Sequence, residues 1–478
     1  MMKLNNIINK LKKYDLIVSY DMDDIDFSYV SYDSNDVLDN TLFVCKGVSF
    51  KKEYLEAAIS KGVCCYVSET DYSVSIPKII VSDSRKALAV ISGLFYPDNL
   101  FKIGITGTKG KTTTNYFIHN ILNNYLGYKP GIFATHYFYS GKNEGENHLT
   151  TPESLELHKY LNEMMNSNIG YMSMEVSSQA SKHNRIFGMN FDIGCFLNIS
   201  PDHISPLEHS DFEDYFACKL EFLKKCDTVI VYKHTDYYDR VIQSVKDKKI
   251  ITFGFKDSDY IISNIRNDKG LCFDVNGKTY KIGMLGRFNI INAVCAIVIS
   301  DIIGVSYDSV LKGLLETTVS GRMNVFYSDV CPIIVDYAHN ELSAKALYES
   351  LKEDFPDKNI KVVFGCPGDK GINRRRDMGL LAGQYASYVY LTAEDPGHSK
   401  VTDICNDIIK YIEKYHSNYE IIEDRKTAIL KAINDATSDD VIALLGKGDE
   451  NYQMVDGKWI PYETDIEVVK NELSKVKE

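Results

Sequence analysis

The chain has 478 residues, of which 44% are hydrophobic and 25% are charged, and its formal net charge is -12. This length predicts about three domains with a sizeable core. The acidic balance disfavours a broad surface for nucleic acid or anionic membranes, so we expect a small substrate and no nucleic-acid partner. No apolar run is long enough for a signal peptide or a membrane span, which favours a cytoplasmic protein without membrane contact.

The first part of the chain alternates β-branched runs with helical segments. We expect strands at residues 41–46, 63–68 and 78–82 and a helix at 51–61. A second helix, capped by Ser82 or Asp83, ends near Pro97. The first domain therefore spans residues 1–98.

Residues 104–114, Gly-Ile-Thr-Gly-Thr-Lys-Gly-Lys-Thr-Thr-Thr, predict a phosphate-binding loop between a strand at 102–106 and a helix. Glycines let backbone N–H groups face an anion, Lys111 reaches the terminal phosphates, and Thr112 or Thr113 offers a hydroxyl to Mg²⁺. The strict pattern is not met, because Ile105 stands where its first glycine is expected. A plain Gly/Thr turn is the alternative interpretation.

Further α/β alternation fills the rest of the chain. We expect strands at residues 170–176, 192–198, 228–232 and 249–253, a β-rich patch at 260–282 and a helix at 289–303. A third unit follows residues 321–323, with strands at 333–336, 360–364, 388–392 and 441–445. This order predicts an α/β fold with mostly parallel, doubly wound sheets and domains at 99–320 and 321–478. Eleven scattered cysteines without a CxxC pair predict buried, reduced thiols.

Polar residues follow two of the central strands. Glu175 and His203 form a plausible pair of ligands for a hard cation beside the phosphates. A single strand-end Glu or His is more often structural, but the phosphate loop in the same domain favours the ligand interpretation. Lys219, on an apolar helix, is by sequence alone best interpreted as a surface lysine whose stem lies along apolar neighbours. A buried lysine would have a lowered pKa and could react with CO₂.

Taken together, these motifs resemble the Mur ligases, ATP-dependent enzymes that join an amino acid to a UDP-N-acetylmuramoyl peptide. The resemblance is strongest to the members that add the third residue, known as the MurE type, and it covers essentially the whole chain. The segments that carry it are residues 32–34, 42–47, 107–113, 150–154, 174–178, 198–203, 215–219, 321–323 and 336–339.

The resemblance implies a domain for the UDP end, a central P-loop-type ATPase and a C-terminal Rossmann-like domain, and it assigns residues to each ligand. The ATP contacts are Gly107, Thr108, Gly110, Lys111, Thr112, Thr113, Asn289, Asn292, Arg322 and Asp336. The UDP-muramoyl-peptide contacts are Ser34, Thr150, Thr151, Ser178 and Arg185. The amino-acid contacts are Arg375, Asp395, Pro396, Gly446 and Glu450. The Mg²⁺ ligands are Thr112, Glu175, His203 and, once carbamylated, Lys219; Lys111, Lys219 and His203 are the catalytic candidates.

The implied reaction activates the substrate's terminal carboxylate as an acyl phosphate, which the amine of the incoming amino acid then attacks. Diaminopimelate-adding members carry Asp-Asn-Pro-Arg, whereas residues 394–398 here read Glu-Asp-Pro-Gly-His and supply no arginine. Residues 446–450 read Gly-Lys-Gly-Asp-Glu, with an acid, Asp449, where a histidine is usual. These departures disfavour diaminopimelate. Residues 368–376 resemble the lysine-adding members, in which an arginine that aligns with Arg375 binds the α-carboxylate of the amino acid, so we expect L-lysine rather than ornithine or another diamine.

Two alternatives remain at this point. A folylpolyglutamate synthetase or another Mur-like ligase shares the ATPase core, but the region before the phosphate loop argues against a folate ligase. A nucleotide-binding paralogue without turnover is disfavoured by the retention of Lys111, Glu175, His203 and Lys219. We expect the protein to act as a monomer.

Overall fold

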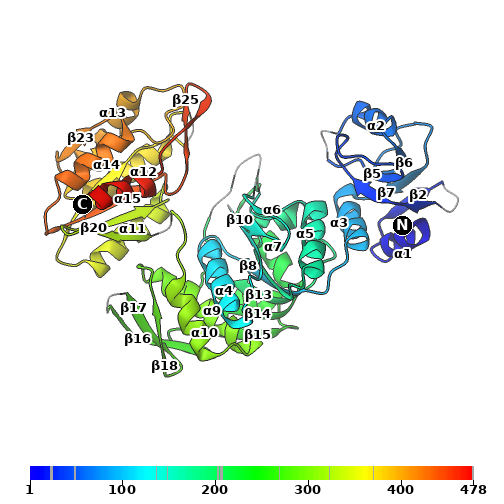
Figure 1. Ribbon diagram of the computed structural model, residues 1–478, viewed down its shortest axis with the longest axis horizontal. Coiled ribbons are helices and arrows are strands. Elements are labelled where there is room, and N and C mark those ends of the chain that lie inside the picture. Colours follow the sequence, from blue (N-terminus) through cyan, green and yellow to red (C-terminus); the bar gives the residue numbers. More distant parts are fainter. Residues whose placement is uncertain are drawn as a thin grey trace. The chain divides into compact units, whose positions relative to one another are not determined.

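The computed structural model describes residues 1–21, 25–47, 50–135, 137–147, 149–201, 204, 208–267, 270–321, 323–369 and 371–475 (Figure 1). The chain divides into two compact units, Met1–Ile262 with Ile291–Gly313, and Ser263–Ile290 with Leu314–Glu478. The domain boundaries near residues 98 and 320 stay predictions.

The first unit begins with a five-stranded sheet. Its order is β2 (Ile17–Tyr20), β7 (Lys78–Val81), β6 (Val63–Ser68), β5 (Thr41–Val44) and β4 (Tyr29–Ser31), and all neighbours are parallel except β2 and β7. A short pair, β1 (Met2–Lys3) and β3 (Asp26–Phe27), lies beside it in sequence. Helices α1 (Leu4–Lys12) and α3 (Ser84–Phe95) bury apolar residues against β5, β6 and β7, and α2 (Lys52–Ile59) contributes to a second cluster. Asp83 is the residue that caps α3, because its carboxylate accepts from the backbone N–H of Lys86.

The larger sheet of the first unit positions the predicted phosphate loop. Its strands run in the order β11 (Glu144–Gly145), β10 (Tyr137–Tyr139), β9 (Gly131–Ala134), β12 (Tyr171–Glu175), β8 (Phe101–Thr106), β13 (Phe191–Phe196), β14 (Cys226–Tyr232), β15 (Lys249–Gly254), β16 (Tyr260–Asn267), β17 (Leu271–Val275) and β18 (Lys278–Ile282). The strands from β9 to β15 are parallel, and β10 and β11 are antiparallel. Its helices are α4 (Lys111–Leu126), α5 (Ser154–Asn166), α6 (Ser178–Lys182), α7 (Phe212–Leu223) and α8 (Tyr238–Ser244). Because β8 lies between β12 and β13, the residues that follow these three strands meet at one edge.

The second unit contains a six-stranded sheet in the order β19 (Asn324–Tyr327), β20 (Pro332–Asp336), β24 (Asp440–Leu445), β21 (Asn359–Phe364), β22 (Tyr388–Leu391) and β23 (Tyr419–Ile421). Every pair is parallel except β19 with β20. Its helices are α11 (Glu341–Asp354), α12 (Asn373–Tyr385), α13 (Val401–Ile412), α14 (Arg425–Asn434) and α15 (Asp465–Lys475). Two hairpins, β17 (Leu271–Val275) with β18 (Lys278–Ile282) and β25 (Tyr452–Val455) with β26 (Lys458–Pro461), are antiparallel. Helices α9 (Phe288–Ile303) and α10 (Tyr307–Glu316) each run across the division between the units.

The predicted α/β class and mostly parallel sheets are confirmed. The sequence prediction missed the antiparallel strands β2, β10, β11 and β19, the parallel strands β4, β9 and β23, the β1–β3 pair and the β25–β26 hairpin. Each of these strands has two to four residues, so its apolar pattern is weak. All eleven cysteines are free, nine of them buried, as predicted. Among the described residues, no helix is long and apolar enough to cross a membrane.

Candidate active site

The predicted phosphate loop lies between the end of β8 and the start of α4. Gly107 and Gly110 have positive φ values of 154° and 85°. A Cβ on Gly110 would lie 2.3 Å from Oδ1 of Asn292, so only glycine fits there. Gly110 is also the N-cap residue of α4, and no side chain caps this helix. The first-turn N–H groups and the helix dipole therefore favour an anion at the loop.

The loop is fixed from the neighbouring strand by Asn198, which follows β13. Its Oδ1 accepts from the N–H of Lys109 (2.9 Å), and its Nδ2 donates to the carbonyl of the same residue (3.0 Å). The hydroxyl of Thr108 accepts from the N–H of Ser200 (3.0 Å) and lies 3.0 Å from the hydroxyl of Tyr215 on α7. Asn198 and Tyr215 are not among the site residues predicted from the sequence. Their signal was positional, because Asn198 follows the strand next to β8.

Two lysines converge on the loop. Nζ of Lys111 donates to the carbonyls of Gly107 (2.9 Å) and Thr108 (3.1 Å). Nζ of Lys219 also donates to the carbonyl of Gly107 (2.8 Å) and lies 4.6 Å from the ring centre of Tyr215. Lys219 is only 2% exposed, so its interpretation as a surface lysine is wrong. The two ammonium groups concentrate positive charge where the terminal phosphates are predicted to bind.

Glu175 ends β12 and pairs in register with Ile105 of β8, which leads into the loop. Its side chain is fully buried, and it accepts from the N–H (2.8 Å) and the hydroxyl (3.1 Å) of Thr135. A carboxylate has about four lone-pair positions, so these two bonds leave room for a cation. Glu175 and the adjacent hydroxyl-bearing loop therefore fit Mg²⁺. His203 lies outside the described residues, and its pairing with Glu175 stays a prediction.

Three of the predicted muramoyl-peptide residues cluster at the end of β12. The hydroxyl of Thr151 donates to the carbonyl of Glu175 (2.9 Å), and Arg185 donates from its NH1 to the carbonyl of Thr151 (3.1 Å). Ser178 begins α6, three residues beyond Glu175. Thr150 is half-buried next to Thr151. Ser34 lies elsewhere, in the turn after β4, where its carbonyl accepts from Lys61 (2.7 Å).

Arg185 belongs to a charged pair with Glu153. Nε of Arg185 lies 2.8 Å from Glu153, and Nζ of Lys46, which follows β5, lies 2.6 Å from it. Burial alone raises the pKa of Glu153, but Lys46 and Arg185 outweigh it and lower that pKa below its usual value. The cluster therefore holds two cations and one carboxylate, and it joins the N-terminal sheet to the end of β12.

In the second unit, several predicted residues follow neighbouring parallel strands. Asp336 ends β20 and accepts from the N–H groups of Met323 and Ala338 (2.8 Å each). Gly446 follows β24, has a φ of 106°, and donates to the carbonyl of Asp336 (3.2 Å). Arg322 lies outside the described residues. Asn289 on α9 is buried and donates to the carbonyl of Leu285 (2.6 Å).

Lys447 organises the carboxylates near the predicted amino-acid site. It is fully buried, and its Nζ lies 2.9 Å from Asp395 and 2.6 Å from Glu450. The second oxygen of Glu450 accepts from the hydroxyl of Tyr337 (2.9 Å). Neighbouring Glu394 is buried, and burial raises the pKa of its carboxyl to about 7 even though Arg425 opposes the shift. Lys447 and Glu394 are not among the site residues predicted from the sequence.

Arg375 on α12 is held by the protein itself. Its NH1 donates to Asp407 (2.8 Å) and its NH2 to the carbonyl of Gly368 (2.8 Å), while its buried Nε–H has no partner among the described residues. A Cβ on Gly368 would lie 1.8 Å from the carbonyl oxygen of Pro396, so these two loops are in close contact. The amino-acid role of Arg375 stays a prediction.

Asp369 holds residues 397–398 in place, within the segment where diaminopimelate-adding members are expected to carry arginine. Its carboxylate accepts from the N–H of His398 (3.1 Å) and lies 2.9 Å from Nδ1 of the same residue. Gly397 has a φ of 58° and exchanges backbone hydrogen bonds with Met454 (2.9 Å) and Asp456 (2.8 Å) of the β25–β26 hairpin. A Cβ on Gly397 would lie 2.1 Å from Oδ2 of Asp369, so a larger residue does not fit without a shift.

Comparisons with known proteins agree with this arrangement. Residues 105–300 match the model of the Mur ligase middle domain, and residues 321–448 match that of the Mur ligase glutamate ligase domain. The UDP-N-acetylmuramoyl-L-alanyl-D-glutamate--L-lysine ligase of Streptococcus thermophilus is 39% identical over 95% of this chain and 94% of its own length. The ligase of the same name from Streptococcus pneumoniae serotype 4 is 38% identical over 99% of this chain and 100% of its own. A solved UDP-N-acetylmuramoyl-L-alanyl-D-glutamate--2,6-diaminopimelate ligase shares the fold, with a TM-score of 0.71 and 24% identity over 95% of this chain and 96% of that one.

Proposed function

The chain belongs to the Mur ligase family, and we propose that it joins L-lysine to UDP-N-acetylmuramoyl-L-alanyl-D-glutamate, with ATP converted to ADP and phosphate, in peptidoglycan precursor synthesis. The observation that carries this proposal is the 39% identity to a lysine ligase over 95% of the chain. That match extends through the region before the phosphate loop, which argues against a folylpolyglutamate synthetase.

The first half-reaction belongs to the phosphate loop. The loop amides and Lys111 hold the phosphates of ATP, and a carboxylate of the dipeptide attacks the γ-phosphorus, so that ADP leaves and an acyl phosphate forms. Negative charge builds up on the phosphoryl group during its transfer. Lys111, whose ammonium group lies against the loop, would stabilise this charge. Mg²⁺, held by Thr112, Glu175 and His203, would neutralise phosphate charge there.

In the second half-reaction, the amine of lysine attacks the acyl carbon, and phosphate leaves from the tetrahedral intermediate. The amine must be deprotonated to attack, so activity falls at low pH. Thr151, Ser178 and Arg185 hold the peptide end of the UDP substrate at the end of β12. The main contribution of the protein is to position the reacting groups and to stabilise their charges.

Lys219 is the candidate for carbamylation. Its amine, once neutral, adds to CO₂ and releases a proton, which converts a buried cation into a carbamate anion. Burial favours the neutral amine, and the location beside Gly107 would place the new anion at the phosphate loop, where it would serve a second Mg²⁺.

The second unit supports L-lysine as the amino acid. The position that needs an arginine for diaminopimelate is Gly397, and its neighbour His398 is bound to Asp369. Arg375, Asp395, Pro396, Gly446 and Glu450 are the proposed contacts to the amino acid. Asn289, Asn292, Arg322 and Asp336 are the proposed contacts to the nucleotide from α9 and the second unit.

The test is ADP release from UDP-N-acetylmuramoyl-L-alanyl-D-glutamate with L-lysine, L-ornithine and meso-diaminopimelate, each at the same concentration. We expect turnover with lysine and much less with diaminopimelate. A folate ligase would instead require a folate and glutamate, and a paralogue that only binds nucleotide would release no ADP with any of these substrates. Either result would overturn the proposal.

A further inference from the structure

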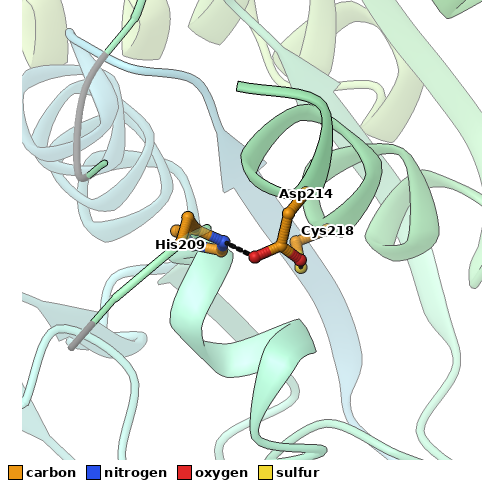
Figure 2. Close-up of side chains that lie close together, drawn as sticks. All are labelled: His209, Asp214 and Cys218. Carbon is orange, nitrogen blue, oxygen red and sulfur yellow. Dashed lines mark hydrogen bonds and ion pairs between the residues drawn. The ribbon is translucent and has the colours of Figure 1, made fainter. Parts of the chain in front are cut away.

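A buried histidine outside the predicted site contacts one of its residues. His209 is fully buried, and its Nε2 lies 2.9 Å from the hydroxyl oxygen of Ser178, a predicted muramoyl-peptide contact. Its Nδ1 lies 3.0 Å from Oδ2 of Asp214, in the first turn of α7. Figure 2 shows the imidazole facing the carboxylate of Asp214. Cys218 lies beside Asp214, and both residues belong to α7.

The three side chains His209, Asp214 and Cys218 have the composition of a metal site, since their ligand atoms lie within 4.8 Å of one another. Their hydrogen bonds, however, do not favour a metal site. Asp214 also binds Lys182 (2.6 Å) and the N–H of Ser210 (3.3 Å), and the second ring nitrogen of His209 is used by Ser178. A cation would have to displace an ammonium group from Asp214, so these residues form a hydrogen-bonded chain from Lys182 through Asp214 and His209 to Ser178.

Proton positions along this chain follow from its one anion. Lys182 and His209 lower the pKa of Asp214 to about 2, so Asp214 is a carboxylate that only accepts. Nδ1 of His209 therefore donates to it. With its proton on Nδ1, a neutral imidazole has its lone pair on Nε2, which lies 2.9 Å from the hydroxyl oxygen of Ser178. The hydroxyl of Ser178 then donates to Nε2, and its oxygen lone pairs are left for another donor.

Helix α7 connects this chain to the phosphate loop. Asp214 accepts from Lys182 of α6, while Tyr215 and Lys219 on the same helix as Asp214 contact Thr108 and Gly107. The ring centres of His209 and Tyr215 lie 5.3 Å apart at an angle of 72°. One helix therefore fixes both the phosphate loop and the orientation of Ser178.

We propose that His209 is a positioning residue for the muramoyl-peptide substrate: it takes the hydroxyl proton of Ser178, so that Ser178 accepts a hydrogen bond from an N–H or O–H group of the peptide end. This inference rests on the proposed function. His209 does not touch the substrate and acts only through Ser178.

The test uses isosteres of the two ring nitrogens in the full-length enzyme. Glutamine places a polar atom near the position of Nε2, and asparagine places one near the position of Nδ1. We expect Ser178→Ala and His209→Asn to raise the KM for the UDP-muramoyl dipeptide about 3- to 10-fold, as for the loss of one hydrogen bond. The KM values for ATP and L-lysine should stay within about twofold, because Ser178 is not among the proposed contacts of these ligands. His209→Gln should stay near wild type.

The double variant His209→Asn/Ser178→Ala separates positioning from general stability. If His209 acts through Ser178, the double variant has the same KM as Ser178→Ala alone. Multiplied effects, or equal shifts of all three KM values, would overturn the inference. Cys218→Ser is the matched control, because Cys218 contacts Asp214 only at 3.9 Å.

Two further measurements keep the outcome interpretable. Calorimetric binding of the dipeptide without ATP should weaken in parallel with KM. If His209→Asn does not fold, Asp214→Asn replaces it, since it removes the charge that fixes the Nδ1 proton, and the same equality with its Ser178→Ala double variant is required. A wild-type enzyme that releases no ADP with dipeptide and lysine contradicts the proposed function, whereas an active enzyme with additive variants contradicts only the role of His209.

Discussion

In the first unit, Lys111 and Lys219 donate to the carbonyl of Gly107, whereas in the second unit Lys447 donates to the carboxylates of Asp395 and Glu450. A carbonyl oxygen is neutral, so this contact orients an ammonium group without cancelling its charge. A carboxylate cancels it, so the second arrangement is a neutralised network. The two sites therefore differ in the described partners of their lysines, which are a neutral carbonyl at Gly107 and two carboxylates at Lys447.

The two units also differ in their buried titratable groups. Burial lowers the pKa of His119 and of His158, both in the first unit, to about 4. Burial raises the pKa of Glu394, in the second unit, to about 7. Each unit therefore favours the neutral form of these groups. Keeping that form reduces the stability of the first unit at low pH, and it reduces the stability of the second unit as the pH rises.

Removing the cation from the loop is the largest expected effect. Lys111→Ala should reduce ADP formation at least about 100- to 1,000-fold, the cost of losing one charge-stabilising donor, while the protein stays folded. Steady-state ADP release measures this, with thermal unfolding as the check on folding. Lys129→Ala, which removes a half-exposed lysine near the end of α4, should remain active. Turnover of Lys111→Ala within about tenfold of wild type would contradict the assignment.

Removing Lys219 should lower the activity nearly as much as removing Lys111. Lys219→Ala should lose about 100-fold in activity, and added formate or acetate should restore part of it by supplying a carboxylate at the vacant position. Lys224→Ala, one residue beyond α7, is the control. Full activity of Lys219→Ala would contradict a catalytic role and would mean that the contact of Lys219 with Gly107 is only structural.

In the second unit, the corresponding substitution should act on stability. Lys447→Met leaves Asp395 and Glu450 without their buried partner and should lower the free energy of unfolding by about 3–5 kcal/mol. Urea unfolding measures this, and Lys458→Met on the exposed strand β26 is the control. Adding Glu450→Gln to Lys447→Met should recover part of the loss. An unchanged unfolding midpoint would mean that the network is not neutralised as described.

The opposite pKa shifts predict opposite responses to pH. For His119 and His158 the folded pKa lies below the ordinary value of 6.5, so their contribution is present above pH 6.5 and is lost as the pH falls toward 4. For Glu394 the folded pKa lies above the ordinary value of 4.5, so stability is lost as the pH rises from 4.5 to about 7. Each shift corresponds to about 3 kcal/mol.

Hydrogen exchange resolved along the chain separates these two effects. Protection of α4 and α5 should fall in acid, and protection of β22 and β24 should fall between pH 4.5 and 7. Glu394→Gln should abolish the second trend and leave the first. The same pH trend in both units would contradict the comparison.

The smallest expected effect concerns the choice of amino acid. L-lysine should exceed meso-diaminopimelate in kcat/KM by about 10- to 100-fold, as expected for one missing charge-assisted hydrogen bond. Competition at equal concentrations measures the ratio. Gly397→Arg alone should not transfer the preference, because its Cβ would lie 2.1 Å from Asp369. A full change of preference to diaminopimelate in Gly397→Arg would show that the side chain of Asp369 moves aside at little cost.

The fold and much of the site could be predicted because they depend on local patterns. Apolar periodicity located β8, β12 and β13, and a glycine-rich turn between a strand and a helix located the phosphate loop. The apolar pattern around Lys219 alone favoured a surface lysine, and this interpretation is wrong; its role at the site was expected only from the resemblance to the Mur ligases. Burial depends on neighbours from other elements, which a single-sequence pattern does not contain.

By itself, the sequence determined the α/β alternation, the loop that ends at Lys111, the carboxylate at the end of β12 and the missing arginine at Gly397. These follow from the residues and their immediate neighbours. Only the tertiary structure decided which charges meet: Lys219 and Gly107 are 112 residues apart, Lys447 and Asp395 are 52 apart, and His209 and Ser178 are 31 apart. Electrostatic strength depends on distance and burial, and both are set when the sheet brings the ends of its strands together.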